Sequence, residues 1–378
     1  MNDILTAREN FPYLNSGKIY FNHASSGPIS ITVREKLSEV ILEKSETDID
    51  EYQKFLQTSG DTKNMLSKMI NTIPERIAFV DNTTNGINIL AQAVKWKRGD
   101  RILLNDLEFP ANVYPFLNLK NEGVEIDFIK SNNGIVTAEE VIKNIKPKTK
   151  LVSISQVQFL TGYRVNLEKI GEVCKQNKII FSIDAIQGLG AVRLDVQKAN
   201  ISFLSSGTQK WLLGLQGLGF IYVSEELQNM MRPKIAGWLS VDDAWNLLNY
   251  DFKPKKTAEY FQSGTLNTLG VYALNASLKF FNGYGFDLIE KKVVENSAYL
   301  MEQLEKIGIK PILQNCPKEN LAGIVTFKHH DSKRIFDALI KNNISCSLRE
   351  GMIRFSPHFY NISREADKVA DILAGIIK

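Results

Sequence analysis

Residues 179–187 have the sequence Ile-Ile-Phe-Ser-Ile-Asp-Ala-Ile-Gln, and residues 204–210 have the sequence Leu-Ser-Ser-Gly-Thr-Gln-Lys. The first stretch predicts a buried strand that ends at Asp184, which places a carboxylate at the carboxyl edge of a sheet, where open α/β folds bind ligands. The second stretch places Lys210 after another strand-like run and before apolar residues, which favours a sheltered amine. Taken alone, Asp184 is also compatible with capping the next turn, and most lysines are solvated surface charges.

A sheltered lysine is disfavoured as an ammonium ion, so its pKa falls toward the range in which the amine attacks carbonyl groups. Thr83 and Thr84 follow one expected strand and begin an expected helix. Their hydroxyls, the free backbone N–H groups and the helix dipole together favour a bound phosphate. An ordinary helix N-cap is the alternative interpretation of this pair.

The central part of the chain alternates short apolar runs with helical patterns, which predicts an α/β fold with a mainly parallel sheet. Asn166 is the expected N-cap of the helix over 167–176. The expected strands are 76–81, 101–105, 124–130, 150–156, 178–184, 201–205 and 219–223. The expected helices are 31–44, 49–71, 84–97, 137–145 and 167–176.

The carboxy-terminal part changes in character after about residue 270 and predicts a smaller α+β domain. From residue 273 onward we expect a helix, a strand, a helix, a strand pair and a final helix, with strands over 323–328, 344–348 and 352–356. The predicted large domain spans 18–270, and the predicted small domain comprises 271–378 together with 1–17.

Composition narrows the classes of function. With 378 residues, of which 44% are hydrophobic, the chain can bury a large core. Its 46 basic and 42 acidic residues are interspersed, so we expect a small-molecule partner and neither nucleic acid nor a membrane. The amino terminus lacks the apolar run of a signal peptide, which predicts a cytoplasmic location. The three cysteines and four histidines have no metal-binding spacing, so no metal is expected.

Together, and in order along nearly the whole chain, these residues resemble the class V aminotransferase family of pyridoxal phosphate enzymes, which includes cysteine desulfurases, kynureninase and isopenicillin N epimerase. Ser206-Gly-Thr-Gln-Lys210 is similar to the Ser-Gly-Ser-Gln-Lys cofactor-lysine motif of the family's alanine–glyoxylate and serine–pyruvate aminotransferases. Asp184-Ala-Ile-Gln187 is similar to the Asp-x-x-Gln of desulfurases. The resemblance implies the aspartate aminotransferase-like fold, fold type I, with pyridoxal 5'-phosphate as the cofactor.

The resemblance also implies a role for each residue of these motifs. Lys210 forms a Schiff base with the cofactor and moves protons at the substrate α-carbon, while Asp184 pairs with the pyridinium nitrogen. A carboxylate at contact distance favours that ring charge by about 4 kcal/mol at an effective dielectric constant of about 20. The remaining expected contacts are Gln187 with the phenolic oxygen, and Thr83, Thr84 and Gln209 with the phosphate.

Two further segments resemble parts of the family's active site. Glu108-Phe-Pro-Ala-Asn112 aligns with the segment that stacks on the cofactor ring, so Phe109 is the expected stacking residue. Desulfurases have histidine there, which makes this chain more similar to kynureninase and the epimerase-like members. Gly264-Thr265 is similar to the family's Gly-Thr-Pro-Asn-Thr segment, with Leu266 in place of proline. Because that threonine reaches the phosphate of the neighbouring subunit, the resemblance implies a homodimer with shared active sites.

Two residues are candidates for substrate binding. Met352-Ile-Arg-Phe-Ser-Pro-His-Phe-Tyr-Asn361 resembles the family segment whose arginine clamps the α-carboxylate, and the planar guanidinium of Arg354 suits that task. A structural arginine at a strand end is the alternative. His23 lies in Tyr20-Phe-Asn-His-Ala-Ser-Ser-Gly27, which matches the family's entry segment. It is expected near the substrate, with a packed, hydrogen-bonded histidine as the alternative.

The sequence leaves the reaction open. Transamination needs only the lysine, the electron sink and a carboxylate clamp, so an aminotransferase is the preferred prediction. The alternatives are a lyase of the cysteine desulfurase, selenocysteine lyase or kynureninase kind, an amino-acid epimerase, and a binding protein without turnover. A desulfurase needs a mobile thiolate. Cys346 lies in an expected strand only eight residues before Arg354, so we interpret it as a packed residue.

Overall fold

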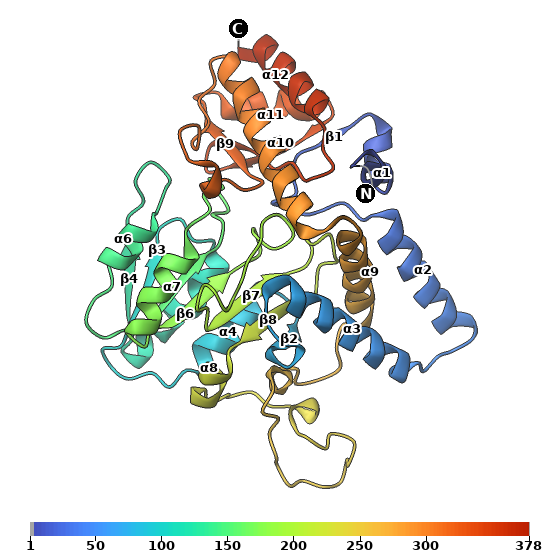
Figure 1. The fold of residues 1–378 in the computed structure, drawn as a ribbon, viewed down its shortest axis with the longest axis vertical. Coiled ribbons are helices and arrows are strands. Elements are labelled where there is room, and N and C mark those ends of the chain that lie inside the picture. The colour runs from blue at the N-terminus through green and yellow to red at the C-terminus, as the bar shows by residue number, and fades with distance from the viewer. Residues whose placement is uncertain (1–3, 378) are drawn as a thin grey trace.

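The computed structural model describes residues 4–377, and a seven-stranded sheet forms the centre of its larger part (Figure 1). The strand order is β2-β8-β7-β6-β5-β3-β4. Strand β8 is antiparallel to both of its neighbours, whereas the other neighbouring strands are parallel. The strands are β2 (Ile77–Val80), β3 (Arg101–Asn105), β4 (Glu125–Ile129), β5 (Thr149–Ser155), β6 (Ile180–Asp184), β7 (Phe203–Gly207) and β8 (Gly219–Val223).

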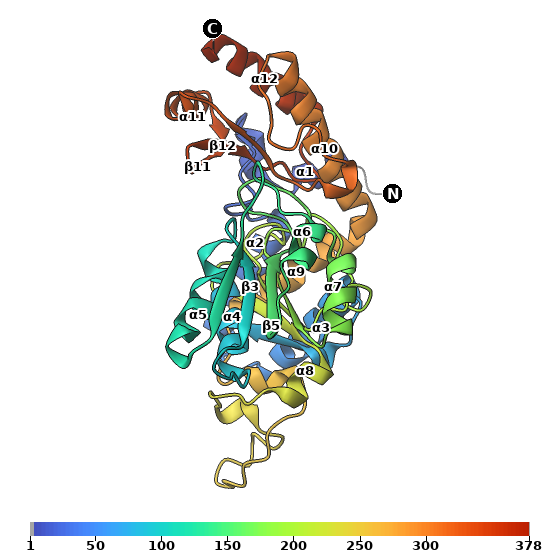
Figure 2. The same cartoon turned by 90° about the vertical axis from the view of Figure 1, so that its left-hand side faces the viewer.

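Helices cover both faces of this sheet, as Figure 2 shows with α4 and α5 on one side and α7 and α3 on the other. Alternate residues of a strand therefore enter different cores: Phe181 and Ile183 of β6 join one apolar cluster, and Ile180 joins another. The helices of the larger part are α2 (Ile31–Glu46), α3 (Tyr52–Ile70), α4 (Thr83–Ala93), α5 (Tyr114–Leu117), α6 (Ala138–Lys143), α7 (Leu167–Gln176), α8 (Glu225–Met230) and α9 (Thr268–Tyr284).

Most of the predicted elements of the larger part are confirmed. Asn166 caps α7, because its side chain accepts a hydrogen bond from the Lys169 backbone N–H. Several helix boundaries differ from the prediction by a few residues. Helix α3 begins at Tyr52 and not at residue 49. Helix α4 begins one residue earlier than predicted, at Thr83, and ends at Ala93 and not at residue 97, because Val94 takes an extended conformation.

The smaller part follows α9 and lies above the sheet in Figure 1. The predicted single helix after residue 273 is wrong, because Gly285 separates α9 from α10 with a φ of 81°. The predicted strand over 344–348 is also wrong as one element, since it divides at Cys346. Its elements are α10 (Phe286–Lys306), β9 (Val325–Lys328), α11 (Ser332–Lys341), β10 (Ile344–Ser345), β11 (Ser347–Arg349), β12 (Met352–Phe355) and α12 (Ser363–Ile377).

The division at Cys346 has a tertiary cause. Strand β10 pairs in parallel with β1 (Ile19–Tyr20), whereas β11 pairs antiparallel with β12 in a sheet of order β11-β12-β9. The amino-terminal segment, with α1 (Ile4–Glu9), thus reaches the smaller part through β1. The domain boundary near residue 270 stays a prediction. Residues 1–3 and 378 of the predicted small domain lie outside the described residues.

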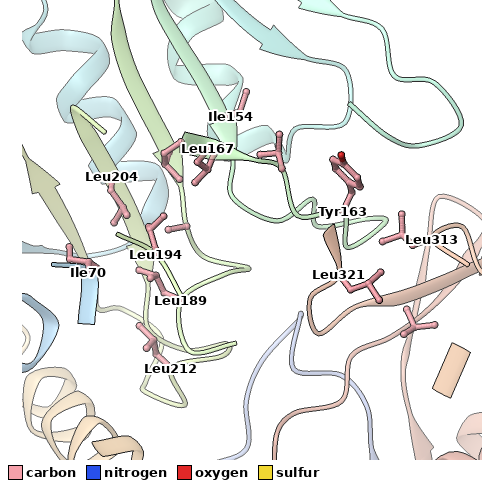
Figure 3. Packing of buried hydrophobic residues seen from close by; sticks show 14 of the residues in the cluster. Ile70, Ile154, Tyr163, Leu167, Leu189, Leu194, Leu204, Leu212, Leu313 and Leu321 are labelled. Atoms are coloured by element: carbon pink, nitrogen blue, oxygen red, sulfur yellow. The ribbon is translucent and has the colours of Figure 1, made fainter. Parts of the chain in front are cut away.

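One apolar core connects the two parts, and Figure 3 shows a portion of it. Leu204 of β7 and Leu212 belong to the same buried cluster as Leu313 and Leu321. The apolar core is therefore continuous between the sheet and the smaller part. Among the described residues, no helix is both long enough and apolar enough to span a membrane.

Candidate active site

A cavity of about 290 Å³ lies where β6, β7 and α4 meet the smaller part. Its walls combine the carboxyl edge of the sheet with residues from the amino-terminal segment and from the β11–β12 hairpin. This is the edge at which open α/β sheets bind ligands. The lining residues are Ala24, Ser25, Asn82, Thr83, Thr84, Phe109, Ala111, Phe159, Asp184, Ile186, Gln187, Gln209, Lys210, Arg349 and Arg354.

Asp184 is the last residue of β6, and only 3% of it is exposed. Its carboxylate accepts a hydrogen bond of 3.0 Å from the Ile186 backbone N–H, so part of its role is the local turn cap that the sequence also allowed. Burial raises the pKa of the Asp184 carboxyl, while the nearby charge of Lys210 opposes that rise. A buried carboxylate beside a cation can hold a second, ligand-borne positive charge.

Lys210 follows β7 and lines the same cavity, with its Nζ 5.7 Å from the centre of the Phe109 ring. Burial lowers the pKa of the Lys210 amine. The neighbouring charge of Asp184 opposes that shift, and the charges of Arg354 and Arg349 add to it. The neutral, nucleophilic form of the amine is therefore more accessible than in a solvated lysine.

The backbone around Lys210 is held from two sides. The Gly27 N–H donates to the Gln209 carbonyl at 2.7 Å, and a side chain at Gly27 would lie 2.5 Å from the Lys210 carbonyl oxygen. On the other side, the buried Trp211 indole N–H donates to Gln187 Oε1 at 2.9 Å. Gln187 Nε2 donates in turn to the Ala24 carbonyl at 2.9 Å, which leaves its second amide hydrogen for another acceptor.

The amino terminus of α4 forms a second wall of the cavity. Asn82 caps the helix by accepting from the Asn85 N–H at 2.9 Å. Thr83 is 5% exposed, and its Oγ1 is buried without a hydrogen-bond partner among the described residues. An unpaired buried hydroxyl and the free N–H groups of a first helical turn together fit an anion. At Gly207, a Cβ would lie 2.5 Å from Gln209 Oε1, so the glycine makes room for that side chain.

Phe109 lines the cavity and is partly exposed to solvent. Its ring is 45% exposed and makes an edge-to-face contact with Phe159, with 5.3 Å between ring centres. The preceding residue, Glu108, is buried and accepts hydrogen bonds from Asn105, Asn112, Ser155 and Gln158. These contacts fix the loop that carries Phe109, and an aromatic ring at this place can stack on a flat ligand.

The hairpin supplies two arginines. Arg354 is 2% exposed; it donates to the Phe159 carbonyl at 2.5 Å and to Ser25 Oγ at 2.9 Å, and its Nε is buried without a partner among the described residues. Burial lowers the pKa of Arg354 to about 10. Across residues 4–377, no carboxylate forms an ion pair with Arg354 or with the exposed Arg349. A buried cation without a counter-ion is costly, which indicates an anionic ligand.

The family model described as aminotransferase class V matches residues 19–369. This chain belongs to that family. Its members bind pyridoxal phosphate. An uncharacterised aminotransferase of Bacillus subtilis is 26% identical over 82% of this chain and 82% of its own length. A probable cysteine desulfurase of Mycoplasma genitalium is 31% identical over 73% of this chain and 68% of its own length.

Solved structures confirm the predicted fold type I architecture for this family member. The apo structure of a cysteine desulfurase from Thermococcus onnurineus covers 100% of this chain and 98% of its own, with a TM-score of 0.90 and 22% identity. At that identity, the likeness concerns the fold. It includes the seven-stranded sheet and the small carboxy-terminal part.

The structure brings most of the predicted site residues of this class V family chain together. The residues that meet in the cavity are Thr83, Thr84, Phe109, Asp184, Gln187, Gln209, Lys210 and Arg354. Gly264 and Thr265 do not reach it, and they line a separate surface pocket that includes Asn85 and Asn267. Their predicted contact with a neighbouring subunit stays a prediction.

His23 lies outside the residues that line the cavity and is fully buried. Its Nδ1 donates to the Ser356 carbonyl at 2.8 Å, and its Nε2 accepts from the Tyr360 hydroxyl at 2.5 Å. The packed, hydrogen-bonded arrangement is therefore the one present in the structure. A direct contact between His23 and a substrate stays a prediction.

Sequence reasoning did not identify Arg349, Glu108 or Gly27 as part of the site. Arg349 had a signal, because the short Arg-Glu-Gly turn predicts a tight hairpin with Arg354 on the other strand. Glu108 and Gly27 act through contacts distant in sequence, which no local pattern reveals. Among residues 4–377, no three His, Cys, Asp or Glu side chains are grouped as a metal site would require.

Proposed function

We propose that this chain is a pyridoxal phosphate-dependent enzyme that acts on a small amino acid. We further propose that it is a lyase acting at the β-carbon, as the names of its cysteine desulfurase relatives suggest. One observation carries the proposal: Asp184, Lys210 and the unpaired Arg354 converge on a single cavity. A cofactor-binding protein without turnover would not need a buried arginine that awaits a carboxylate.

The cavity fits the cofactor at each of its polar groups. The unpaired Thr83 hydroxyl, the first turn of α4 and Gln209 would hold the phosphate, and the second amide hydrogen of Gln187 would serve the phenolic oxygen. Asp184 would hold the ring nitrogen, and Lys210 would attach the cofactor covalently. The bound cofactor supplies an electron sink for negative charge at the substrate α-carbon.

Four residues of the chain then have separate roles in the reaction. Arg354 grips the α-carboxylate and so orients the α-carbon toward Lys210. The Lys210 amine takes the α-proton, for which its lowered pKa is suited. Phe109 would stack on one face of the cofactor ring and exclude water from that face. Asp184 would keep the ring nitrogen protonated, because a buried carboxylate stabilises that charge.

The burial and positions of the three cysteines bear on whether a protein thiolate takes part in the lyase reaction. Cys346 is 5% exposed and lies between β10 and β11, and burial raises the pKa of its thiol to about 12. Burial raises the thiol pKa of Cys174 and of Cys316 as well. None of the three lines the cavity. We therefore expect the leaving group to pass to solvent or to an external acceptor, without attack by a protein thiolate.

Transamination is the second candidate. It is favoured by the relationship to an uncharacterised aminotransferase and by the lack of any thiol among the lining residues. Both reactions begin with removal of the α-proton, so the lysine, the aspartate and the arginine serve either one. The lyase is preferred because the relative with the higher identity is named a probable cysteine desulfurase.

The proposal extends to a homodimer. Thr265 is exposed and lies outside the active-site cavity of its own chain. This position supports a contact between Gly264-Thr265 and the phosphate bound to a second subunit. Sedimentation of the purified protein should give twice the mass of one chain. Thr265→Ala should weaken cofactor binding while it leaves the mass unchanged.

The test of the reaction is to mix the cofactor-loaded enzyme with single amino acids in the absence of a keto acid. We expect cysteine or another β-substituted amino acid to release its leaving group as an anion together with pyruvate and ammonia; with an added external thiol, cysteine can instead give alanine and the persulfide of that thiol. Stable conversion of the cofactor to its amino form, without a released leaving group, would establish half-transamination and exclude the lyase proposal.

The role of cysteine is tested separately with Cys346→Ala. Lyase activity should persist, because this thiol is buried and outside the cavity. Cys316→Ser, at a partly exposed position, is the matched control. If only Cys346→Ala abolished product release while its melting temperature stayed normal, a thiolate mechanism would be established.

A further inference from the structure

The β11–β12 hairpin has a tight turn that fixes the positions of its side chains. Glu350 and Gly351 form the two-residue loop, and both have positive φ angles, of 47° and 72°. Two central residues with positive φ are the mark of a type I′ turn, whose twist matches that of the paired strands. The register is therefore set locally, with Arg349 opposite Met352 and Ser347 opposite Arg354.

This register places both arginines on one face of the hairpin. Residues two apart on a strand share a face, and so do directly paired residues on neighbouring strands. Arg349 and Arg354 are thus diagonal neighbours, with Cα atoms about 7–8 Å apart. The opposite face carries Ile353 and Phe355, which are fully buried in the core.

The charges on the arginine face are not balanced by the protein. Arg354 donates to a carbonyl and a hydroxyl, and Ser25 passes that contact on to Ser347 at 2.9 Å. Arg349 is exposed, lines the cavity and pairs with no described carboxylate. Its charge lowers the pKa of both Lys210 and Arg354, so it lies near both. Against three cations the cavity lining offers one carboxylate, Asp184.

We propose that Arg349 binds a second acidic group on the substrate, so that the enzyme selects amino acids whose side chain carries a negative charge. The inference rests on the proposed function, in which Arg354 takes the α-carboxylate. Two guanidinium groups on one face can then bind the two ends of a dianionic amino acid at once. A neutral side chain would leave Arg349 without a counter-ion.

The experiment compares L-aspartate with L-asparagine, which are nearly isosteric and differ in side-chain charge. Their dissociation constants for the cofactor-loaded enzyme are measured by calorimetry and by the change in the cofactor's visible absorbance. We expect aspartate to bind about tenfold more tightly, the magnitude of one partly exposed charge-assisted pair. Arg349→Gln should remove this preference by weakening aspartate alone, and Arg349→Lys should keep part of it.

Arg364→Gln is the matched control, because Arg364 is exposed on α12 and outside the cavity lining; it should keep the full preference. Equal affinities in the unmodified enzyme, or an equal loss for both ligands in Arg349→Gln, would overturn the inference. Weaker binding of the cofactor itself in Arg349→Gln would assign this arginine to the phosphate and would also overturn it.

The result is separable from the reaction assay. If aspartate is preferred but no leaving group is released from any amino acid, the lyase proposal fails and the charge selection stands. If a lyase reaction occurs but aspartate and asparagine bind alike, the reaction stands and the charge selection fails.

Discussion

The two sides of the cavity differ in whether their charges have partners within the protein. The sheet side consists of Asp184 and Lys210, and the hairpin side consists of Arg349 and Arg354. On the sheet side, Asp184 and Lys210 have opposite charges, and each moderates the pKa shift that burial imposes on the other. On the hairpin side, Arg349 and Arg354 have the same charge and no described carboxylate partner. On the sheet side the two opposite charges balance each other within the protein, and this arrangement suits a permanent cofactor. The hairpin side lacks counter-ions and suits a substrate that arrives and leaves.

The largest effect should come from removing the sheet side's amine. Lys210→Ala deletes both the point of covalent attachment and the group that moves the α-proton. We expect turnover to fall on the order of 10⁴-fold, the upper range for a positioned acid–base group. Absorbance of the lysine-bound cofactor should disappear in the purified variant. Lys198→Ala, at the surface, should behave like the unmodified enzyme, and a normally coloured, active Lys210→Ala would refute the central assignment.

Removing the sheet side's negative charge should have the next largest effect. Asp184→Asn keeps the shape but loses the charge that stabilises a protonated ring nitrogen. A loss of about 4 kcal/mol corresponds to about 10³-fold in turnover. The free energy of unfolding should change little in comparison, as measured by denaturation of both proteins. Asp287→Asn is the surface control, and a change confined to folding stability would indicate that Asp184 is only a turn cap.

On the hairpin side, the effect should be on substrate binding. Arg354→Gln should raise KM by about 100-fold, because it removes a charge-assisted clamp on the α-carboxylate. The apo protein should not lose stability, since the variant also removes a buried cation that has no counter-ion. Steady-state kinetics measure the change in KM, and thermal melting measures the stability of the apo protein. A fall in kcat at constant KM, or a large drop in melting temperature, would point to a structural arginine.

The smallest effect should come from the histidines behind the cavity. His358 is fully buried, and its Nε2 donates to the Trp211 carbonyl at 3.0 Å; burial lowers its pKa from 6.5 to about 4. The unfolded chain therefore binds this proton first as pH falls. The contribution of His358 is fully present above pH 6.5 and declines between pH 6.5 and about 4, by about 1.4 kcal/mol per pH unit.

Denaturation between pH 7 and pH 5 checks this slope. His358→Gln keeps a donor for the Trp211 carbonyl but cannot titrate, so its unfolding free energy should depend less steeply on pH. The slope should not reach zero, because burial also lowers the pKa of His23. An identical slope in the two proteins would show that His358 does not titrate in this range.

Local sequence patterns predicted the framework well. Strands such as Arg101–Asn105 and Gly219–Val223 have the predicted ends, because apolar runs bounded by turn residues are local signals. Asp184 and Lys210 were also identifiable, since the end of a buried strand fixes where the next side chain must emerge. Motif resemblance then assigned roles that periodicity alone could not.

Other features depended on contacts between segments far apart in sequence. Cys346 lies between two strands because the amino-terminal segment pairs with one of them and β12 with the other. His23 is packed because Ser356 and Tyr360 reach it from the far end of the chain. The sequence by itself predicted the strands of the sheet, which follow from local pattern, and the roles of Lys210 and Asp184, which follow from motif resemblance. Only the tertiary structure decided that Arg349 faces the same cavity, because a neighbouring strand and its register set that position.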